Sequence, residues 1–293
     1  VLNWSLRDRP DATPPADLPL AEGGLYGADG APRAAFAAWS DFAALPRVED
    51  GQGVFPGAVA AVEPSGDGAE LRFASGARLR VRFLAPDVLR FRMAPSGTFR
   101  DRLTGAIVEP SELRLPPGAL SVDPAPGRTI LATDRLELEI IHDPPTLEAR
   151  RPDGSVLFRT RDGGFHVDPE SGAVQLRLEA PDGRRYFGLG LRGGPMDRRG
   201  DVYVMRNSDN GAYGEKTQPL YSSTPFYYAL QDGRFHGLFL DNAAQPYFDL
   251  DSTRDGTVRL GAAEGEIDAY LFAGPDAGTV AGRFTALTGR TPL

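Results

Sequence analysis

Apolar and polar residues alternate one by one in several short runs, and this pattern limits the chain to a small set of folds. The apolar members of four such runs are Leu79, Val81 and Phe83; Leu89, Phe91 and Met93; Leu136, Leu138 and Ile140; and Val174, Leu176 and Leu178. Successive side chains of a β-strand point to opposite faces, so a period of two indicates strands with one buried face and one hydrated face. Such strands are typical of antiparallel sheets.

Turn sequences separate these runs. The chain has 35 Gly and 26 Pro in 293 residues, and they are spread along the sequence instead of being concentrated in one linker. Pro152-Asp153-Gly154, Pro181-Asp182-Gly183 and Gln231-Asp232-Gly233 occur where hairpins would close. Many short strands with frequent turns predict a mainly β protein, an antiparallel β-sandwich or a barrel.

Helical patterns occur only near the two ends of the chain. Pro32 to Leu45 carries an apolar stripe at helical spacing, and residues 1–46 therefore read as a strand, a loop and a helix. Ala277 to Leu287 carries a second stripe, and Gly289 follows it as a helix cap. We therefore predict an N-terminal segment over residues 1–46 and a sandwich domain over residues 47–293 that ends in a helix.

The composition argues against several classes of function. Thirty-two basic and 40 acidic residues give a net charge of −8, whereas a nucleic-acid-binding protein needs a basic face, so we expect no nucleic-acid partner. No run of about 18 apolar residues is present, so we expect no transmembrane helix and no membrane partner. Without cysteine and with three histidines, the chain is not expected to be built around a metal. The sequence does not indicate a cellular compartment.

Two short motifs have a functional and a structural interpretation. Phe187-Gly188-Leu189-Gly190 is similar to a phosphate-binding glycine loop, but the six-residue fingerprint is incomplete and lacks a βαβ context. We therefore predict no cofactor, and a strand whose glycines let the backbone bend or approach a neighbour closely. Ser222 and Ser223 stand outside a G-x-S-x-G nucleophile motif, which favours structural hydroxyl groups.

The stretch from Arg206 to Gly214 is polar and glycine-rich. It lies between an apolar strand and a second strand predicted at Pro219 to Leu230. Asx residues and a tyrosine are suited to binding sugar hydroxyls, because they offer paired donors and acceptors and a ring for stacking. Composition alone favours an ordinary long hairpin loop stabilised by Asx-turns, so both interpretations stay open.

Six motifs together resemble one family. In chain order they are Tyr186-Phe187-Gly188-Leu189-Gly190, Asn207-Ser208-Asp209, Pro219-Leu220-Tyr221-Ser222-Ser223-Thr224-Pro225-Phe226, Gly237-Leu238-Phe239-Leu240-Asp241-Asn242, Asp268-Ala269-Tyr270-Leu271-Phe272-Ala273-Gly274-Pro275 and Thr285-Ala286-Leu287-Thr288-Gly289-Arg290. This series resembles the N-terminal β-sandwich of glycoside hydrolase family 31, the retaining α-glucosidases, α-xylosidases and their relatives. The resemblance covers roughly residues 50–293 and is strongest after Tyr186.

The resemblance implies a galactose-mutarotase-like sandwich that precedes a β/α barrel, and the chain stops at the lead-in to that barrel. In the family both catalytic aspartates belong to the barrel, so we expect no catalytic residue here. The implied function is that of a non-catalytic N-terminal domain of a retaining α-glycosidase. The implied partners are an α-linked oligosaccharide or glycoside and a barrel domain of the same parent chain.

The resemblance also implies a substrate-binding loop. Asp209 matches the aspartate that contacts substrate hydroxyls in the family, and Asn207 and Tyr213 lie on the same loop. An ionised Asp is a charge-assisted acceptor, so it discriminates strongly against a sugar that lacks the matching hydroxyl. The chain departs from the family at Leu191, where Gly-x-Gly is usually followed by Glu. This departure places in doubt any role of that strand end near the site.

Other interpretations remain at this stage. Residues 1–45 resemble the last strand, loop and helix of a glycosidase barrel, or else form a strand and helix that dock on the sandwich. The whole chain is alternatively a free-standing carbohydrate-binding sandwich. A second alternative is an aldose epimerase of the mutarotase fold, whose chemistry would use a carboxylate with one of His142, His166 and His236.

Overall fold

The computed structural model of the protein describes residues 47–48, 53–100, 104–108, 111–208, 214, 217–218 and 220–290. The predicted helix at Pro32 to Leu45 and the rest of segment 1–46 lie outside these residues. No helix among the described residues is long and apolar enough to cross a membrane.

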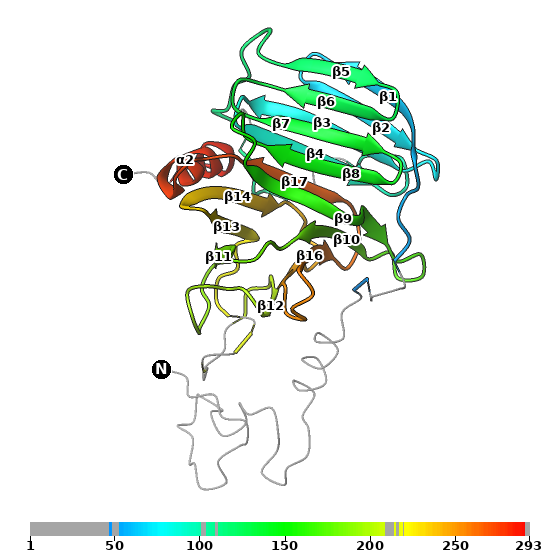
Figure 1. Cartoon of the computed structure of the whole chain (residues 1–293). Helices are drawn as coiled ribbons and strands as arrows, with labels where there is room; N and C mark the ends of the chain where they lie inside the picture. The colour runs from blue at the N-terminus through cyan, green and yellow to red at the C-terminus, as the bar shows by residue number, and fades with distance from the viewer. Residues whose placement is uncertain are drawn as a thin grey trace, which may run out of the picture.

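Two antiparallel sheets lie face to face (Figure 1). The first sheet contains, in spatial order, β1 (Val59–Ser65), β2 (Gly68–Phe73), β3 (Arg78–Ala85), β4 (Val88–Ala94), β17 (Ile267–Phe272), β14 (Arg234–Leu240), β13 (Phe226–Gln231) and β11 (Arg185–Gly188). The second contains β12 (Val202–Val204), β15 (Tyr247–Leu250), β16 (Thr257–Ala262), β10 (Val174–Glu179), β9 (Val156–Val167), β8 (Pro145–Arg150), β7 (Glu137–His142), β6 (Arg128–Ala132) and β5 (Ser121–Ala125). The predicted mainly β sandwich is confirmed.

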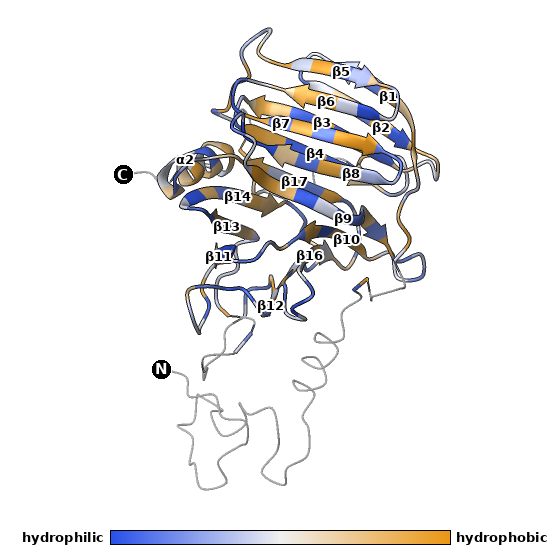
Figure 2. Ribbon diagram, viewed as in Figure 1, coloured by the Kyte–Doolittle hydropathy of each residue, from blue (hydrophilic) through white to orange (hydrophobic). Residues whose placement is uncertain are grey.

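The apolar members of the alternating runs form the core between the sheets. Val81 in β3, Phe91 in β4 and Leu176 in β10 are each fully buried. The Phe91 ring lies 5.5 Å from the ring of Phe158 in β9, so these two aromatic residues join one sheet to the other. Hydrophobic and hydrophilic segments alternate along the strands in Figure 2, as the sequence predicts.

Helix α2 (Ala277–Thr288) covers the other face of the first sheet, beside β14 and β17 (Figure 1). The ring of Phe284 stacks on Phe226 of β13 at 4.2 Å with an interplanar angle of 14°. The Asp276 carboxylate accepts a hydrogen bond from Thr279 N at 2.8 Å and caps the first turn. Gly289 ends the helix with φ 96°, which confirms the predicted helix and its cap.

Two of the three predicted hairpin turns are confirmed. Gln231-Asp232-Gly233 joins β13 to β14, with positive φ at Asp232 and Gly233 as a two-residue hairpin turn requires. Pro152-Asp153-Gly154 joins the paired strands β8 and β9. The prediction is wrong for Pro181-Asp182-Gly183, because this turn leads from β10 in one sheet to β11 in the other. A turn sequence encodes a local reversal of the chain but not the partner of the next strand.

Burial of His236 in β14 makes the stability of the fold depend on pH. His236 is 2% exposed, and burial, followed by the nearby Arg184 and Arg151, holds its pKa well below the ordinary value. The unfolded chain binds a proton near pH 6.5 that the folded chain does not bind. The contribution of the buried, neutral His236 to the free energy of unfolding is therefore fully present above that pH. It is lost as the pH falls below it.

We expect the slope from His236 to reach about 1.4 kcal/mol per pH unit below pH 6. Urea unfolding between pH 7.5 and 5.0 measures this slope and stays above the range in which carboxylates lose their charge. The His236→Gln variant serves as the control and should show a shallower slope over the same range. Equal slopes in the two proteins would assign the pH dependence to other groups.

Candidate functional site

The loop between β12 and β13 carries all three predicted substrate-binding residues. Its described parts include residues 205–208 and 220–225, and Ser208 N donates to Leu220 O at 3.2 Å where the two parts meet. Asn207 lies at this base of the loop and is exposed, whereas Asp209 and Tyr213 lie outside the described residues. The predicted strand at Pro219 to Leu230 is wrong in its first half, because β13 begins only at Phe226.

Residues 222–224 pack against a glycine turn instead of pairing as a strand. Gly188, Leu189 and Gly190 have φ values of 107°, 68° and 80° in succession. A Cβ atom at Gly190 would lie 2.5 Å from Ser222 O, and the amide of Leu191 donates to the same oxygen at 2.8 Å. The interpretation of this motif as a bend with close backbone approach is confirmed, and it explains the glycines without a phosphate ligand.

Ser223 connects the two sides of the loop base. Its amide donates to Asn207 Oδ1 at 2.7 Å, and its hydroxyl donates to Arg206 O at 2.6 Å. The hydroxyl also accepts from Arg192 Nη2 at 2.8 Å, so it is a structural group, as the sequence favours. Through its amide oxygen, Asn207 therefore joins the two sides of the loop base.

Two residues at this base were not found by sequence reasoning. Gln218 Nε2 donates to Val202 O at 2.7 Å, and its Oε1 accepts from Val204 N at 3.1 Å, so Gln218 fixes the loop to β12. Arg192 is 9% exposed and donates to Val204 O as well as to Ser223. Neither residue belongs to a local motif, and only tertiary contacts reveal their roles.

The three histidines lie apart on the two sheets. His142 ends β7, His166 lies in β9 and His236 lies in β14, so no two of them are on neighbouring strands. His142 Nε2 is hydrogen-bonded to Thr129 Oγ1 at 3.0 Å. The described residues contain no group of three or more side chains that could hold a metal ion.

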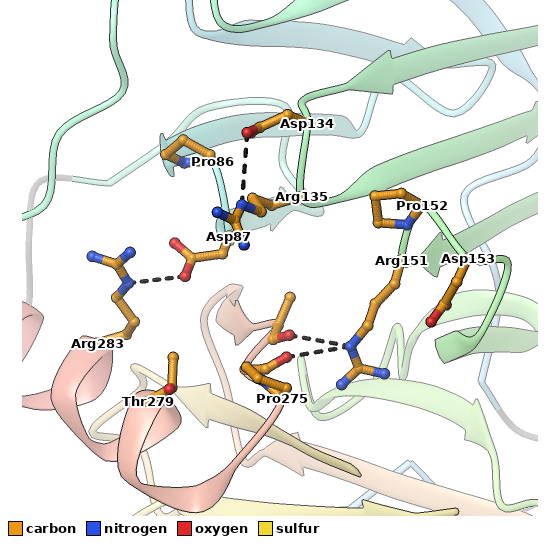
Figure 3. A pocket seen from close by; sticks show the side chains of 12 residues that line it. Pro86, Asp87, Asp134, Arg135, Arg151, Pro152, Asp153, Pro275, Thr279 and Arg283 are labelled. Atoms are coloured by element: carbon orange, nitrogen blue, oxygen red, sulfur yellow. Dashed lines mark hydrogen bonds and ion pairs between the residues drawn. The ribbon is translucent and has the colours of Figure 1, made fainter.

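A cavity of about 850 Å³ lies at the opposite end of β13 and β14, near the first turn of α2 (Figure 3). Its three carboxylates all have an arginine partner. Asp87 Oδ2 accepts from Arg283 Nε at 2.9 Å, Asp134 lies 3.6 Å from Arg135, and Asp153 is paired with Arg234. Asp87 and Asp153 thus join segments that are distant in the chain, whereas Asp134 and Arg135 are exposed neighbours in the sequence.

Arg151 crosses this cavity and joins the β8–β9 turn to the connection between β17 and α2. It donates to Phe235 O at 2.8 Å and to Ala273 O and Gly274 O at 3.3 Å each. In Figure 3 two dashed lines join Arg151 to the last two of these oxygens, beside Pro275. Burial, followed by the charge of Arg234, lowers its pKa from the ordinary value. The cavity is therefore bounded by structural contacts, and the β12–β13 loop remains the candidate site.

The known proteins to which the chain is similar include α-glucosidases, and one family model matches it. The model of the glycosyl hydrolase 31 N-terminal galactose mutarotase-like domain matches residues 78–249. The chain is 38% identical over 219 residues to α-glucosidase 2 of Bacillus thermoamyloliquefaciens, covering 73% of this chain and 27% of that protein. It is 34% identical over 104 residues to an α-glucosidase of Saccharolobus solfataricus, covering 36% of this chain and 15% of that protein.

The fold is also found in solved structures. A glycoside hydrolase family 31 dextranase of Flavobacterium johnsoniae, complexed with glucose, superposes with a TM-score of 0.76 at 24% identity. The match covers 82% of this chain and 29% of the dextranase. The chain thus spans about a quarter of the length of the first of these relatives. Since the family model matches more than half of its residues, the chain belongs to the family of glycosyl hydrolase 31 N-terminal galactose mutarotase-like domains.

Proposed function

We propose that the chain is the non-catalytic N-terminal domain of a retaining α-glycosidase, where it supports a catalytic barrel and extends a substrate-contacting loop toward it. The observation that carries this proposal is the 38% identity to an α-glucosidase over 73% of the chain. Retaining hydrolysis requires two carboxyl groups about 5 Å apart on either side of the glycosidic bond. We assign both to the barrel of the whole protein, and α-linked glucosides are the proposed substrates.

The geometry of the loop base supports a role for the loop in substrate binding. Gln218 fixes the returning side of the loop to β12 through two hydrogen bonds, and Ser223 joins that side to Arg192, Arg206 and Asn207 through three more, all of 3.1 Å or less. A substrate-contacting group must be held close to its productive position, because a displacement of about 1 Å can reduce the rate a hundredfold. Asp209, two residues beyond Asn207, is the proposed acceptor for substrate hydroxyls, and Tyr213 is a proposed further contact.

The mass of the native polypeptide, isolated from its source, tests the proposal that a barrel completes this domain. The 293 residues account for 31.5 kDa. We expect a mass more than twice as large. A native mass near 31.5 kDa would contradict the proposal and favour a sandwich that binds carbohydrate alone.

Asp209→Ala in the whole α-glycosidase should lower kcat/KM for an aryl α-glucoside about a hundredfold or more, because a charge-assisted hydrogen bond to substrate is lost. Steady-state kinetics measures this effect. The matched control is Asp123→Ala, which removes an exposed carboxylate from β5 at the far edge of the second sheet and should change kcat/KM less than twofold. Equal kinetics for the two variants would remove Asp209 from the site.

A further inference from the structure

Arg192 is a buried cation that follows the glycine turn. Its Nε donates to Leu189 O at 3.2 Å, which ties the side chain to the turn. Its Nη2 donates to Val204 O at 2.8 Å and to Ser223 Oγ at 2.8 Å. Val204 ends the strand that enters the β12–β13 loop, and Ser223 lies where the loop returns. One guanidinium group therefore contacts both ends of the loop.

Ser223 extends these contacts to the residues that precede Asp209. Its hydroxyl accepts from Arg192 and donates to Arg206 O at 2.6 Å. Its amide donates to Asn207 Oδ1 at 2.7 Å. The chain of contacts runs from Arg192 through Ser223 to Arg206 and Asn207, so the position of the guanidinium group is transmitted to Asn207, one of the predicted substrate-binding residues.

None of the groups that shift the pKa of Arg192 is a carboxylate. Burial comes first among the causes, followed by the charge of Arg198, and together they lower the pKa of Arg192 to about 10. The side chain stays protonated at neutral pH but is destabilised there, because a buried cation needs either an anion or well-aligned acceptors. Here the acceptors are two backbone carbonyls, the Ser223 hydroxyl and, at 3.7 Å, the sulfur of Met205. Because these acceptors lie on the glycine turn and on both ends of the loop, the buried guanidinium group holds the three segments at fixed positions.

We propose that Arg192 is a positioning residue: it fixes the two ends of the β12–β13 loop and thereby the position of Asn207 at the base of that loop. The expected effect of Arg192 on substrate binding rests on the proposed function. The fixing of the loop itself is a property of the chain and is tested separately.

Hydrogen exchange of the whole native polypeptide tests the fixing of the loop. In Arg192→Met we expect the amides of residues 205–208 and 220–224 to exchange about tenfold faster or more, while the amides of β9 and β10 keep their rates. Ser223→Ala removes only the connecting hydroxyl, should fold normally, and should accelerate the same amides by a smaller factor. Arg192→Lys retains a cation that can reach one acceptor and should restore part of the protection.

Arg198→Met is the matched control, because Arg198 is 8% exposed and donates to Gly193 O, to Pro195 O and, at 3.5 Å, to Arg192 O, and to no residue of the loop. It should leave the exchange of residues 205–208 unchanged. The proposal is overturned if Arg192→Met does not accelerate these amides, or if Arg198→Met accelerates them equally. Acceleration throughout the sandwich in both Arg192→Met and Ser223→Ala would also overturn it, because it would mean a general loss of stability.

Kinetics of the whole α-glycosidase separates this inference from the proposed function. A displaced loop weakens substrate binding, so Arg192→Met should raise KM for an aryl α-glucoside more than it lowers kcat, and Arg192→Lys should restore part of KM. Faster exchange of the loop with unchanged KM in Arg192→Met would confirm that Arg192 fixes the loop and would contradict the role of the loop in substrate binding. A changed KM without faster exchange would contradict the positioning role.

Discussion

Replacing Asp251 with Ala should lower the free energy of unfolding by about 3–5 kcal/mol, because it removes a buried carboxylate and leaves the guanidinium group of Arg199, whose side chain is 15% exposed, without its anion. The Asp251 side chain is 3% exposed. Its Oδ2 accepts from Arg199 Nε at 3.1 Å and from Arg199 Nη2 at 2.8 Å, and its Oδ1 accepts from Gly256 N at 2.8 Å. Asp251 also has φ 64°, a conformation that Ala adopts less readily than Asp, which adds to the loss.

The ion pair between Asp251 and Arg199 contributes strongly to stability, because it holds the connection that passes from one sheet to the other. Arg199 also donates to Ala180 O at 3.0 Å, to Pro181 O at 2.7 Å and to Arg184 O at 3.1 Å. These carbonyls belong to the turn that leaves β10 and enters β11. The carboxylate of Asp251, at the end of β15, therefore orients the guanidinium group that closes this edge of the sandwich.

Urea denaturation at neutral pH measures the effect of Asp251→Ala. Glu112→Ala is the control, because Glu112 and its partner Arg290 have side chains that are 61% and 54% exposed, and exposed pairs contribute about 0–1 kcal/mol. A loss below about 1 kcal/mol in Asp251→Ala would mean that the backbone carbonyls alone satisfy Arg199.

The layers of this fold follow from local sequence, whereas the connections between them do not. Alternation in residues 79–83 and 174–178 identified buried strands, and the stripe at Val280 and Phe284 identified α2, because side-chain periodicity is set by the backbone of each element. Pro181-Asp182-Gly183 was wrongly predicted as a hairpin turn. The contacts of Arg199 that hold this turn come from residues distant in the chain, and no local pattern encodes them.

The candidate site shows the same division. The glycine turn was interpreted correctly from its sequence, since two glycines in three residues indicate unusual backbone geometry. The part played by Arg192 was not predicted, because nothing in the sequence distinguishes it from the other arginines. Its burial and its acceptors exist only after β12 and residues 222–224 have come together around it.

Gly190→Ala should lower the free energy of unfolding by about 3–4 kcal/mol, through a strained backbone and a steric clash. Gly190 has φ 80°, which costs an L-residue about 1–2 kcal/mol. The added Cβ would also lie 2.5 Å from Ser222 O and 2.8 Å from Thr224 N. Both neighbours are backbone atoms, so the clash is relieved only if the segment at 222–224 moves.

Gly172→Ala separates the two causes, because Gly172 has φ 78° and no atom within 4 Å of the added Cβ. It should cost about 1–2 kcal/mol, and the difference between the two variants, measured by urea denaturation, is the cost of the clash. Equal losses would mean that residues 222–224 shift without resistance. Since Ser223 lies in that segment, accepts from Arg192 and donates to Asn207, such freedom would also contradict a loop base rigid enough to position Asn207.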